Sequence, residues 1–204
     1  MSDPVADFYR VHVPAQYNAT LTGQRAAATS DPAARALLEE MEAVRASIVV
    51  RVDGATFGFD IERGTMTAVD APARPPFLVM RHAADEFDAI HAACGDSLLG
   101  FLGALAGLGE DMRITSQRVR SLRDLAGGVR LAREGEGGFT LDAWFGAVEV
   151  QEAPQATIRL DAETFARLRA GRLDPQDAFL AGAIPIEGDE GLAIGLALAA
   201  MSPE

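Results

Sequence analysis

The sequence repeats an ordered series of residues at an offset of roughly 80 positions, and this repeat limits the folds open to the chain. The repeated anchors are Phe59 and Phe139, Ile61 and Leu141, Ala71-Pro72 and Ala153-Pro154, Phe87 and Phe165, Asp96 and Asp174, Phe101-Leu102 and Phe179-Leu180, Gly103-Ala104 and Gly182-Ala183, Gly109 and Gly188, and Ile114 and Ile194. Their order is kept while the offset drifts by only a few residues, as small loop insertions would cause. We interpret the chain as a tandem duplication.

Each half begins with a pattern typical of a β-hairpin. Residues 48–61 alternate apolar and polar positions around Asp53-Gly54, a dipeptide that suits a tight turn. Residues 129–143 repeat this pattern around a glycine-rich turn, and residues 156–160 alternate as a further strand. The repeat therefore predicts a hairpin and an additional strand in both halves.

Two short helices are expected after the strands of the second half. Asp161 precedes a segment with Phe165 and Leu168 on one face, and Gly171 follows it as a stop signal. Asp174-Pro175 places an N-cap before a proline at the first helical position. The apolar residues between 183 and 198 lie at even spacing around Gly188, which predicts two closing strands joined by a turn.

The two halves differ at their entries. Asp31 and Pro32 open a predicted helix over residues 31–46, whereas the second half has only residues 121–126 in that place. We therefore expect the second hairpin to rely on the first half for cover. The predicted fold class is α+β, with two related halves, each a mostly antiparallel sheet covered on one face by short helices. The expected divisions are an N-terminal arm at 1–30, a diverged first half at 31–114 and a second half at 115–204.

Composition excludes several classes of function. The 18 basic residues, all arginine, face 30 acidic ones, and the net charge of −12 opposes binding to nucleic acid or anionic membranes. Without lysine there is no Schiff-base or P-loop chemistry, and the single Cys94 cannot form an internal disulfide. The longest nearly uncharged apolar run is too short to span a bilayer, and no signal peptide is recognisable. We expect a cytoplasmic protein without stable membrane insertion.

Residues 157–196 resemble the C-terminal half of the sterol carrier protein type-two family. The resemblance rests on an alternating strand, an acidic helix cap, a Gly-x-Leu motif, an acidic residue before proline, Ala-Phe, and a Gly-x-Ile-x-Ile-x-Gly-Asp motif before a closing apolar strand. In this sequence the motifs are Phe165, Gly171-Arg172-Leu173, Asp174-Pro175, Ala178-Phe179, Gly182, Ile184, Ile186, Gly188-Asp189 and residues 192–198. The specific resemblance covers residues 128–198, and the first half is similar mainly through the repeat.

The resemblance implies a sheet covered by helices with an apolar cavity between them, and a role as a carrier or accessory rather than a catalyst. The residues expected to bind an apolar ligand are Phe139, Leu141, Trp144, Ile158, Phe165, Leu168, Leu173, Phe179, Ile184 and Ile186. The alternative is that these side chains fill the core. Trp144 stands beside Phe145, and because neighbouring strand residues point to opposite faces, we expect one of them to be exposed, at an interface or in a cavity.

Other residue clusters point less clearly to chemistry. Asp88, His91 and Cys94 recur every three residues, but this spacing splays them too widely on a helix to ligate one zinc ion. No nucleophile elbow accompanies the histidines, and the acidic clusters at 39–42 and 187–190 lack the order of a calcium loop. We expect neither catalytic residues, nor a cofactor, nor a metal.

The predicted function is non-enzymatic binding, and transfer or presentation, of a lipid, a sterol or a fatty-acyl-like ligand in an internal cavity. One alternative is a structural or dimerisation module of the same fold whose core is filled by its own side chains. Another is an accessory protein for a hydrophobic metabolite such as an isoprenoid quinone. The ligand, the receiving partner and a homodimeric state are left open by the sequence.

Overall fold

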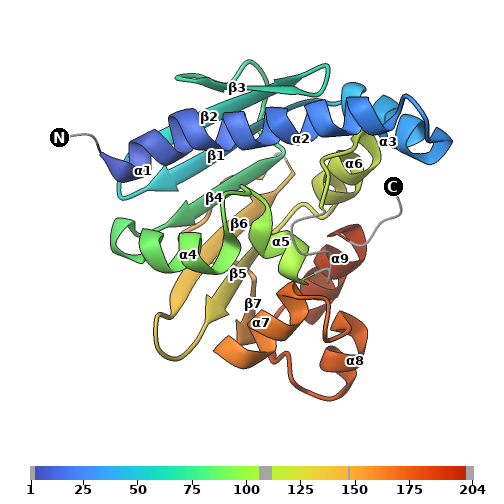
Figure 1. Cartoon of the computed structure of the whole chain (residues 1–204). Coiled ribbons are helices and arrows are strands. Elements are labelled where there is room, and N and C mark those ends of the chain that lie inside the picture. The colour runs from blue at the N-terminus through green and yellow to red at the C-terminus, as the bar shows by residue number, and fades with distance from the viewer. Residues whose placement is uncertain (1–2, 106–111, 147, 201–204) are drawn as a thin grey trace.

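The computed structural model describes residues 3–105, 112–146 and 148–200, which form an α+β fold with one mixed, mostly antiparallel sheet. The elements are α1 (Pro4–Asp7), η1 (Phe8–His12), α2 (Val13–Ala27), α3 (Pro32–Glu42), β1 (Arg45–Val52), β2 (Ala55–Glu62), β3 (Thr65–Val69), β4 (Leu78–His82), η2 (Ala84–Glu86), α4 (Phe87–Cys94), α5 (Gly100–Leu105), α6 (Ser116–Asp124), β5 (Gly128–Arg133), β6 (Phe139–Phe145), β7 (Ala156–Leu160), α7 (Ala162–Arg169), α8 (Pro175–Leu180), β8 (Ile186–Gly188) and α9 (Glu190–Ala200). Figure 1 shows their arrangement.

The strand order is β3-β2-β1-β4-β6-β5-β7-β8. Hairpin β1–β2 is antiparallel and β4 pairs parallel to β1; hairpin β5–β6 is likewise antiparallel and β7 pairs parallel to β5. The same three-strand unit therefore occurs twice. An antiparallel pairing of β4 with β6 joins the two units, from Leu78 opposite Phe145 to Arg81 opposite Asp142. Instead of one sheet per half, the halves share a single continuous sheet.

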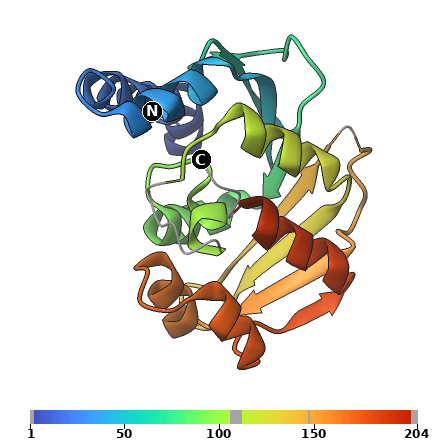
Figure 2. The ribbon, with the colours of Figure 1, turned by 90° about the vertical axis from the view of Figure 1, so that its right-hand side faces the viewer.

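The core lies on one face of this sheet. Ile48 and Val50 of β1 point into it, together with Leu78 and Met80 of β4 and Leu131 of β5, and all are almost fully buried. Residues of the N-terminal arm and of α4, α6, α7 and α9 pack against them, and Figure 2 shows the helices gathered beside this face. The described residues contain no helix long and apolar enough to cross a membrane.

Turns and caps form where the residue types predict them. Asp53 and Gly54 have φ angles of 45° and 92°, the positive values that a two-residue hairpin turn between β1 and β2 needs. Asp161 caps α7 by accepting a hydrogen bond from the Thr164 amide at 2.8 Å. Asp174 caps α8 by accepting from the Gln176 and Asp177 amides. The predicted hairpins, third strand and paired short helices of the second half are therefore present.

The N-terminal arm is helical and packs on the first half of the sheet. Pro14 lacks an amide hydrogen, so the helix cannot form its usual bond to the carbonyl four residues earlier. The wider π-helical turn η1 precedes it, with the Val13 amide donating to the Phe8 carbonyl. Further along, the Asn18 side chain donates to the carbonyl and accepts from the amide of Met66, which ties α2 to the edge strand β3.

The predicted closing strands over residues 183–198 are wrong in their second part. Only Ile186–Gly188 form a strand, and residues 190–200 form the helix α9. Asp189 begins this helix by accepting from the Leu192 amide at 3.0 Å, and the following residues are rich in alanine and leucine, the best helix formers. The buried residues Ala193, Leu196 and Ala200 follow a helical period, whereas Leu198, which fitted the even spacing, is 61% exposed.

Two glycine substitutions should change stability in opposite directions. Gly188 has a φ of +85°, and an added Cβ would lie 2.2 Å from the Gln155 carbonyl oxygen, so Gly188→Ala should lower the free energy of unfolding by at least about 1–3 kcal/mol. Gly23 lies in α2 with open space around it, so Gly23→Ala should raise that free energy by about 0.5–1 kcal/mol. Urea unfolding of both variants measures the two effects, and equal effects would contradict the geometry described for β8.

Candidate groove between two short helices

A surface groove of about 650 Å³ lies between α4 of the first half and α7 of the second. Most of its lining residues are alanines, and Phe165, a glycine and two arginines complete the lining. The lining residues are Ala89, Ala92, Ala93, Arg133, Gly137, Ala162, Phe165, Ala166, Arg169 and Ala170. The volume is within the range of ligand sites, and the lining is largely apolar. The groove therefore has the size and chemistry for an extended apolar molecule.

The groove exists because alanines face it from both helices. Ala89, Ala92 and Ala93 are spaced so that they share one side of α4, and Ala162, Ala166 and Ala170 share one side of α7. Methyl groups are too short to interdigitate across the gap between two helices, so the gap stays open. The alanine spacing is visible in the sequence, but the residues expected to bind the ligand were the larger apolar ones and not the alanines.

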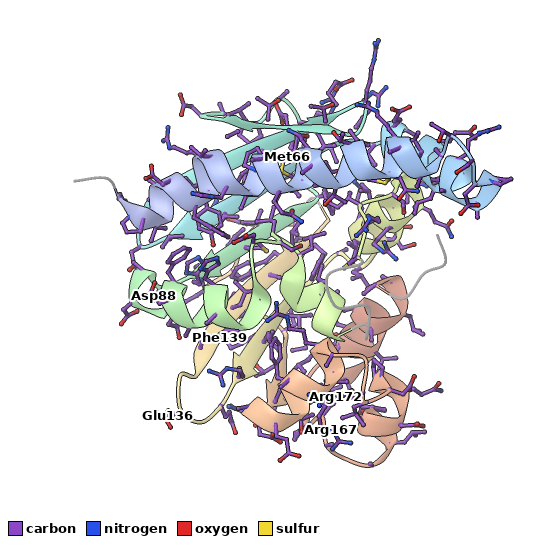
Figure 3. The ribbon with its side chains drawn as sticks, in the orientation of Figure 1. Met66, Asp88, Glu136, Phe139, Arg167 and Arg172 are labelled. Atoms are coloured by element: carbon purple, nitrogen blue, oxygen red, sulfur yellow. The ribbon has the colours of Figure 1, made fainter. Side chains whose placement is uncertain are left out.

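The position of α7 is set by its cap and by one aromatic contact. Both carboxylate oxygens of Asp161 accept from Thr164, one from the amide and one from the hydroxyl, and these bonds lower the pKa of Asp161. One turn later, Phe165 points down to the sheet and meets Phe139 edge-on, with ring centroids 6.1 Å apart. Figure 3 shows Phe139 between the levels of α4 and α7.

Two arginines line the groove. Arg169 at the end of α7 donates to the carbonyls of Ala92 and Ala93, so its side chain connects α7 to the last turn of α4. Arg133 at the end of β5 lies over the Phe139 ring at 5.5 Å and donates to the Glu136 carbonyl at 3.1 Å. The Arg169 guanidinium therefore holds α7 against α4, whereas the contacts of Arg133 lie within the hairpin β5–β6.

The ten residues expected to bind the ligand are mostly core residues. Phe139, Leu141, Trp144, Ile158, Phe165, Leu168 and Ile184 are buried, and Leu173, Phe179 and Ile186 are half-buried. Of these ten, Phe165 lines the groove, while Leu141 lines an enclosed cavity of only about 20 Å³. Their role in binding stays a prediction, and the groove adds alanines and arginines that sequence reasoning missed.

Trp144 and Phe145 point to opposite faces of the sheet, as expected from their adjacency, but neither is exposed. Phe145 is part of the main core, and Trp144 packs with Val49 and Val79 in a small cluster on the other face. Val148 and Val150, in the segment after β6, pack against that cluster. Of the three alternatives expected for this pair, exposure is therefore excluded, because the segment after β6 covers Trp144 and the helices cover Phe145.

The interior of the first half is filled by the N-terminal arm. Phe8 and Tyr9 pack against Phe87 of α4 and Phe57 of β2, with ring centroids 5.1–5.2 Å apart. The enclosed spaces beneath the arm are about 20 and 30 Å³, large enough for water at most. The groove between α4 and α7, rather than an enclosed cavity, is the larger apolar space.

A buried hydrogen bond between Tyr9 and His82 fastens the arm to the sheet. The Tyr9 hydroxyl and His82 Nε2 are 2.7 Å apart, and His82 Nδ1 lies 2.7 Å from the Ala83 carbonyl oxygen. Because that carbonyl can only accept, Nδ1 carries the proton, and the hydroxyl donates to Nε2. Burial lowers the pKa of His82, which keeps the ring neutral.

The other residues considered for chemistry do not converge. Cys94 is buried, and burial raises the pKa of its thiol to about 12, while His91 bonds Asp96 at 2.7 Å and Asp88 is exposed on α4 (Figure 3). Among the described residues, no three histidine, cysteine or acidic side chains gather in a way that could hold a metal ion. In the acidic cluster at 187–190, Glu187 pairs with Arg159 and Asp189 caps α9.

The second part of the chain matches a known family. Residues 113–199 fit the model of the SCP-2 sterol transfer family, which confirms the resemblance found over residues 128–198. This part of the chain is therefore similar to that family. The match does not extend to residues 31–112, so the duplication stays a prediction that the repeated strand unit supports. No curated protein matches the chain.

Solved structures of similar proteins come from insects and yeast. Sterol Carrier Protein 2 Like 2 from Aedes aegypti is 18% identical, with a TM-score of 0.34, over 54% of this chain and 95% of that one. The sterol carrier protein domain 2 of Helicoverpa armigera is 26% identical, with a TM-score of 0.32, over 51% and 88%. Sterol Carrier Protein 2 from Yarrowia lipolytica is 16% identical, with a TM-score of 0.31, over 57% and 90%. With TM-scores below 0.5, these likenesses add nothing to the family match.

The buried Tyr9–His82 pair should make stability depend on pH. The unfolded chain takes up a proton on His82 near pH 6.5, but the folded protein does so only at lower pH. The contribution of His82 to the free energy of unfolding is therefore fully present above pH 6.5. It is lost as pH falls, by up to about 1.4 kcal/mol per pH unit. Unfolding in urea at pH 7.5, 6.5 and 5.5 should show a shallower decline for His82→Gln than for the parent protein. His12→Gln, at an exposed position, is the control and should leave the decline unchanged.

Proposed function

We propose that this protein binds an apolar ligand of the lipid, sterol or fatty-acyl type without transforming it, and that the ligand lies in the groove between α4 and α7. The observation that carries the proposal is a groove of about 650 Å³, lined by alanines and Phe165, at the edge of the segment that matches the SCP-2 sterol transfer family. Transfer or presentation of the ligand inside the cytoplasm belongs to the same proposal.

Apolar burial would drive the binding. A ligand that removes about 300 Å² of apolar surface from water gains roughly 7 kcal/mol before the cost of its immobilisation. Such a gain supports micromolar affinity with little dependence on salt. The alanine side chains of the walls offer no hydrogen-bonding groups, so an alkyl chain or a ring system would lose no polar contacts to them.

A structural or dimerisation module is the second candidate function. The packed interior favours it, because the spaces of about 20 and 30 Å³ beneath the arm cannot hold a lipid. In that case the groove would be a consequence of small residues that permit close contact with another protein surface. The two candidates differ in whether a small apolar molecule binds at all.

Filling the groove should abolish ligand binding. Ala166→Leu combined with Ala92→Leu adds bulk to both walls of the groove. The affinity of delipidated protein for a fluorescent fatty acid should fall by at least about tenfold, because the space that would shield the acyl chain from water is lost. Ala36→Leu is the matched control, since Ala36 is an exposed alanine on α3 away from the groove. This variant should bind the fluorescent fatty acid with the affinity of the parent protein.

The same titration separates the two candidate functions. Binding that persists in the double variant would place the ligand elsewhere in the protein. No binding by the parent protein at tens of micromolar would favour the structural module. Native mass spectrometry of freshly purified protein gives an independent measurement, because a carrier is expected to retain an extractable apolar molecule.

A further inference from the structure

The face of the sheet opposite the helices carries a row of charged side chains. Arg51 of β1, Arg81 of β4, Asp142 of β6 and Arg130 of β5 are register partners on four neighbouring strands, so they lie side by side on this face. We call these four residues the arginine row. It lines part of an open hollow of about 510 Å³.

One carboxylate serves two of the three arginines. Asp142, with only 4% of its side chain exposed, is 2.7 Å from Arg81 Nη2, and its two oxygens accept from Arg130 Nε and Nη2 at 2.6 and 2.9 Å. Arg81 also donates to the Glu152 carbonyl at 2.8 Å. The Arg51 side chain forms no ion pair or hydrogen bond within the described part of the chain. The row therefore holds three guanidinium groups for one carboxylate.

The other carboxylates of the hollow are engaged by the backbone. Glu86 accepts from the Thr140 amide at 2.9 Å and from the Ala83 amide at 3.4 Å, and Asp53 accepts from the Ala84 amide at 2.8 Å. They reduce the overall potential of the hollow, but they do not pair with Arg51. His82, which also lines the hollow, is neutral because its ring is buried.

Like charges that are directly opposite each other on neighbouring strands destabilise a sheet. Arg51 and Arg81 are in this relation, and Thr56 of β2 places a hydroxyl on the other side of Arg51. A bound anion would turn the repulsion into two charge-assisted contacts. A phosphate group suits the position better than a carboxylate, because its oxygens are enough for both guanidinium groups and the hydroxyl at once.

We propose that the open face of the sheet binds a phosphate group between Arg51 and Arg81, with Thr56 as a further donor. This site is independent of the groove between α4 and α7, which lies on the helical side of the sheet. The phosphate belongs either to a free phosphate compound or to a phospholipid headgroup, and both present the same oxygens to the arginines.

The protein contains its own reporter for this site. Trp144 is the single tryptophan, and the Arg81 guanidinium lies over its ring at 4.7 Å from the centroid. An anion that binds Arg81 changes the cation–π contact and therefore the tryptophan fluorescence. Arg51 does not touch Trp144 in this way, so a variant at Arg51 leaves the reporter in place.

The test is a titration of the full chain with inorganic phosphate. Trp144 fluorescence and the thermal unfolding midpoint are the two measurements, and sodium chloride at equal ionic strength is the reference. Phosphate should change the fluorescence saturably and raise the unfolding midpoint, and added salt should weaken both effects. Arg51→Gln should weaken phosphate binding by at least about tenfold. It should also raise the midpoint in chloride alone, because the repulsion with Arg81 is removed. Arg35→Gln, on the exposed surface of α3, is the charge-matched control and should bind phosphate like the parent protein.

Vesicles distinguish the two sources of phosphate. Phosphatidylcholine vesicles containing phosphatidic acid should give the same fluorescence change at much lower phosphate concentration if a headgroup is the source, whereas phosphatidylcholine alone should give none. A response to inorganic phosphate that phosphatidic acid does not improve would assign a free compound. The proposal is overturned if neither probe changes the fluorescence, or if Arg51→Gln responds like the parent protein.

Discussion

The pairing of β4 with β6 holds the two hairpin units in one sheet. Leu78 and Phe145 are opposite each other in this pairing and are completely buried, and Arg81 and Asp142 add an ion pair on the other face. Without this pairing the hairpin β5–β6 would present an open edge and an uncovered apolar side. The pairing also determines where the helices lie, because α4 follows β4 and α7 follows β7. The groove therefore forms at the junction of the halves, between two helices that occupy corresponding places in the repeat.

The two faces of the shared sheet have different chemistry because strand residues alternate. On one face, apolar side chains from both halves merge into a single core with the helices and the N-terminal arm. On the other, only Val49, Val79 and Trp144 form a small apolar cluster, and charged residues surround it. A ligand held by apolar contacts and an anion held by arginines would thus bind on separate sides of a sheet one layer thick. Arg81 connects them indirectly, since its neighbour Met80 on β4 is buried in the core on the helical side.

Local signals predicted the second half well and the long-range arrangement poorly. The hairpins, the strand at 156–160 and the caps at Asp161 and Asp174 depend on neighbouring residues, and those features were predicted from residue type and spacing. The helix α9 was missed because leucine and isoleucine at even positions fit a strand, although alanine and glycine between them gave no β-branched support. The N-terminal arm was not assigned as a helix, because residues 1–30 show no clear periodicity. We expected the first half to cover the second hairpin, but we did not predict that the two halves share one sheet.

The candidate site was predicted least well, and the reason is physical. Large apolar residues in a periodic pattern indicate burial, and the same pattern fits a filled core and a ligand cavity. Phe139, Leu168 and Ile158 became core, whereas the groove is formed by alanines, whose small size leaves space. Phe165 belongs to both, because it packs on Phe139 and lines the groove. An edge-on aromatic pair contributes about 0.5–1.5 kcal/mol beyond its buried area, which is small beside the roughly 7 kcal/mol gained by burying an apolar ligand. A shift of the eight-residue helix α7 that breaks this contact would also expose part of Phe165 and Leu168, so deepening the groove costs that lost burial as well as the aromatic contact.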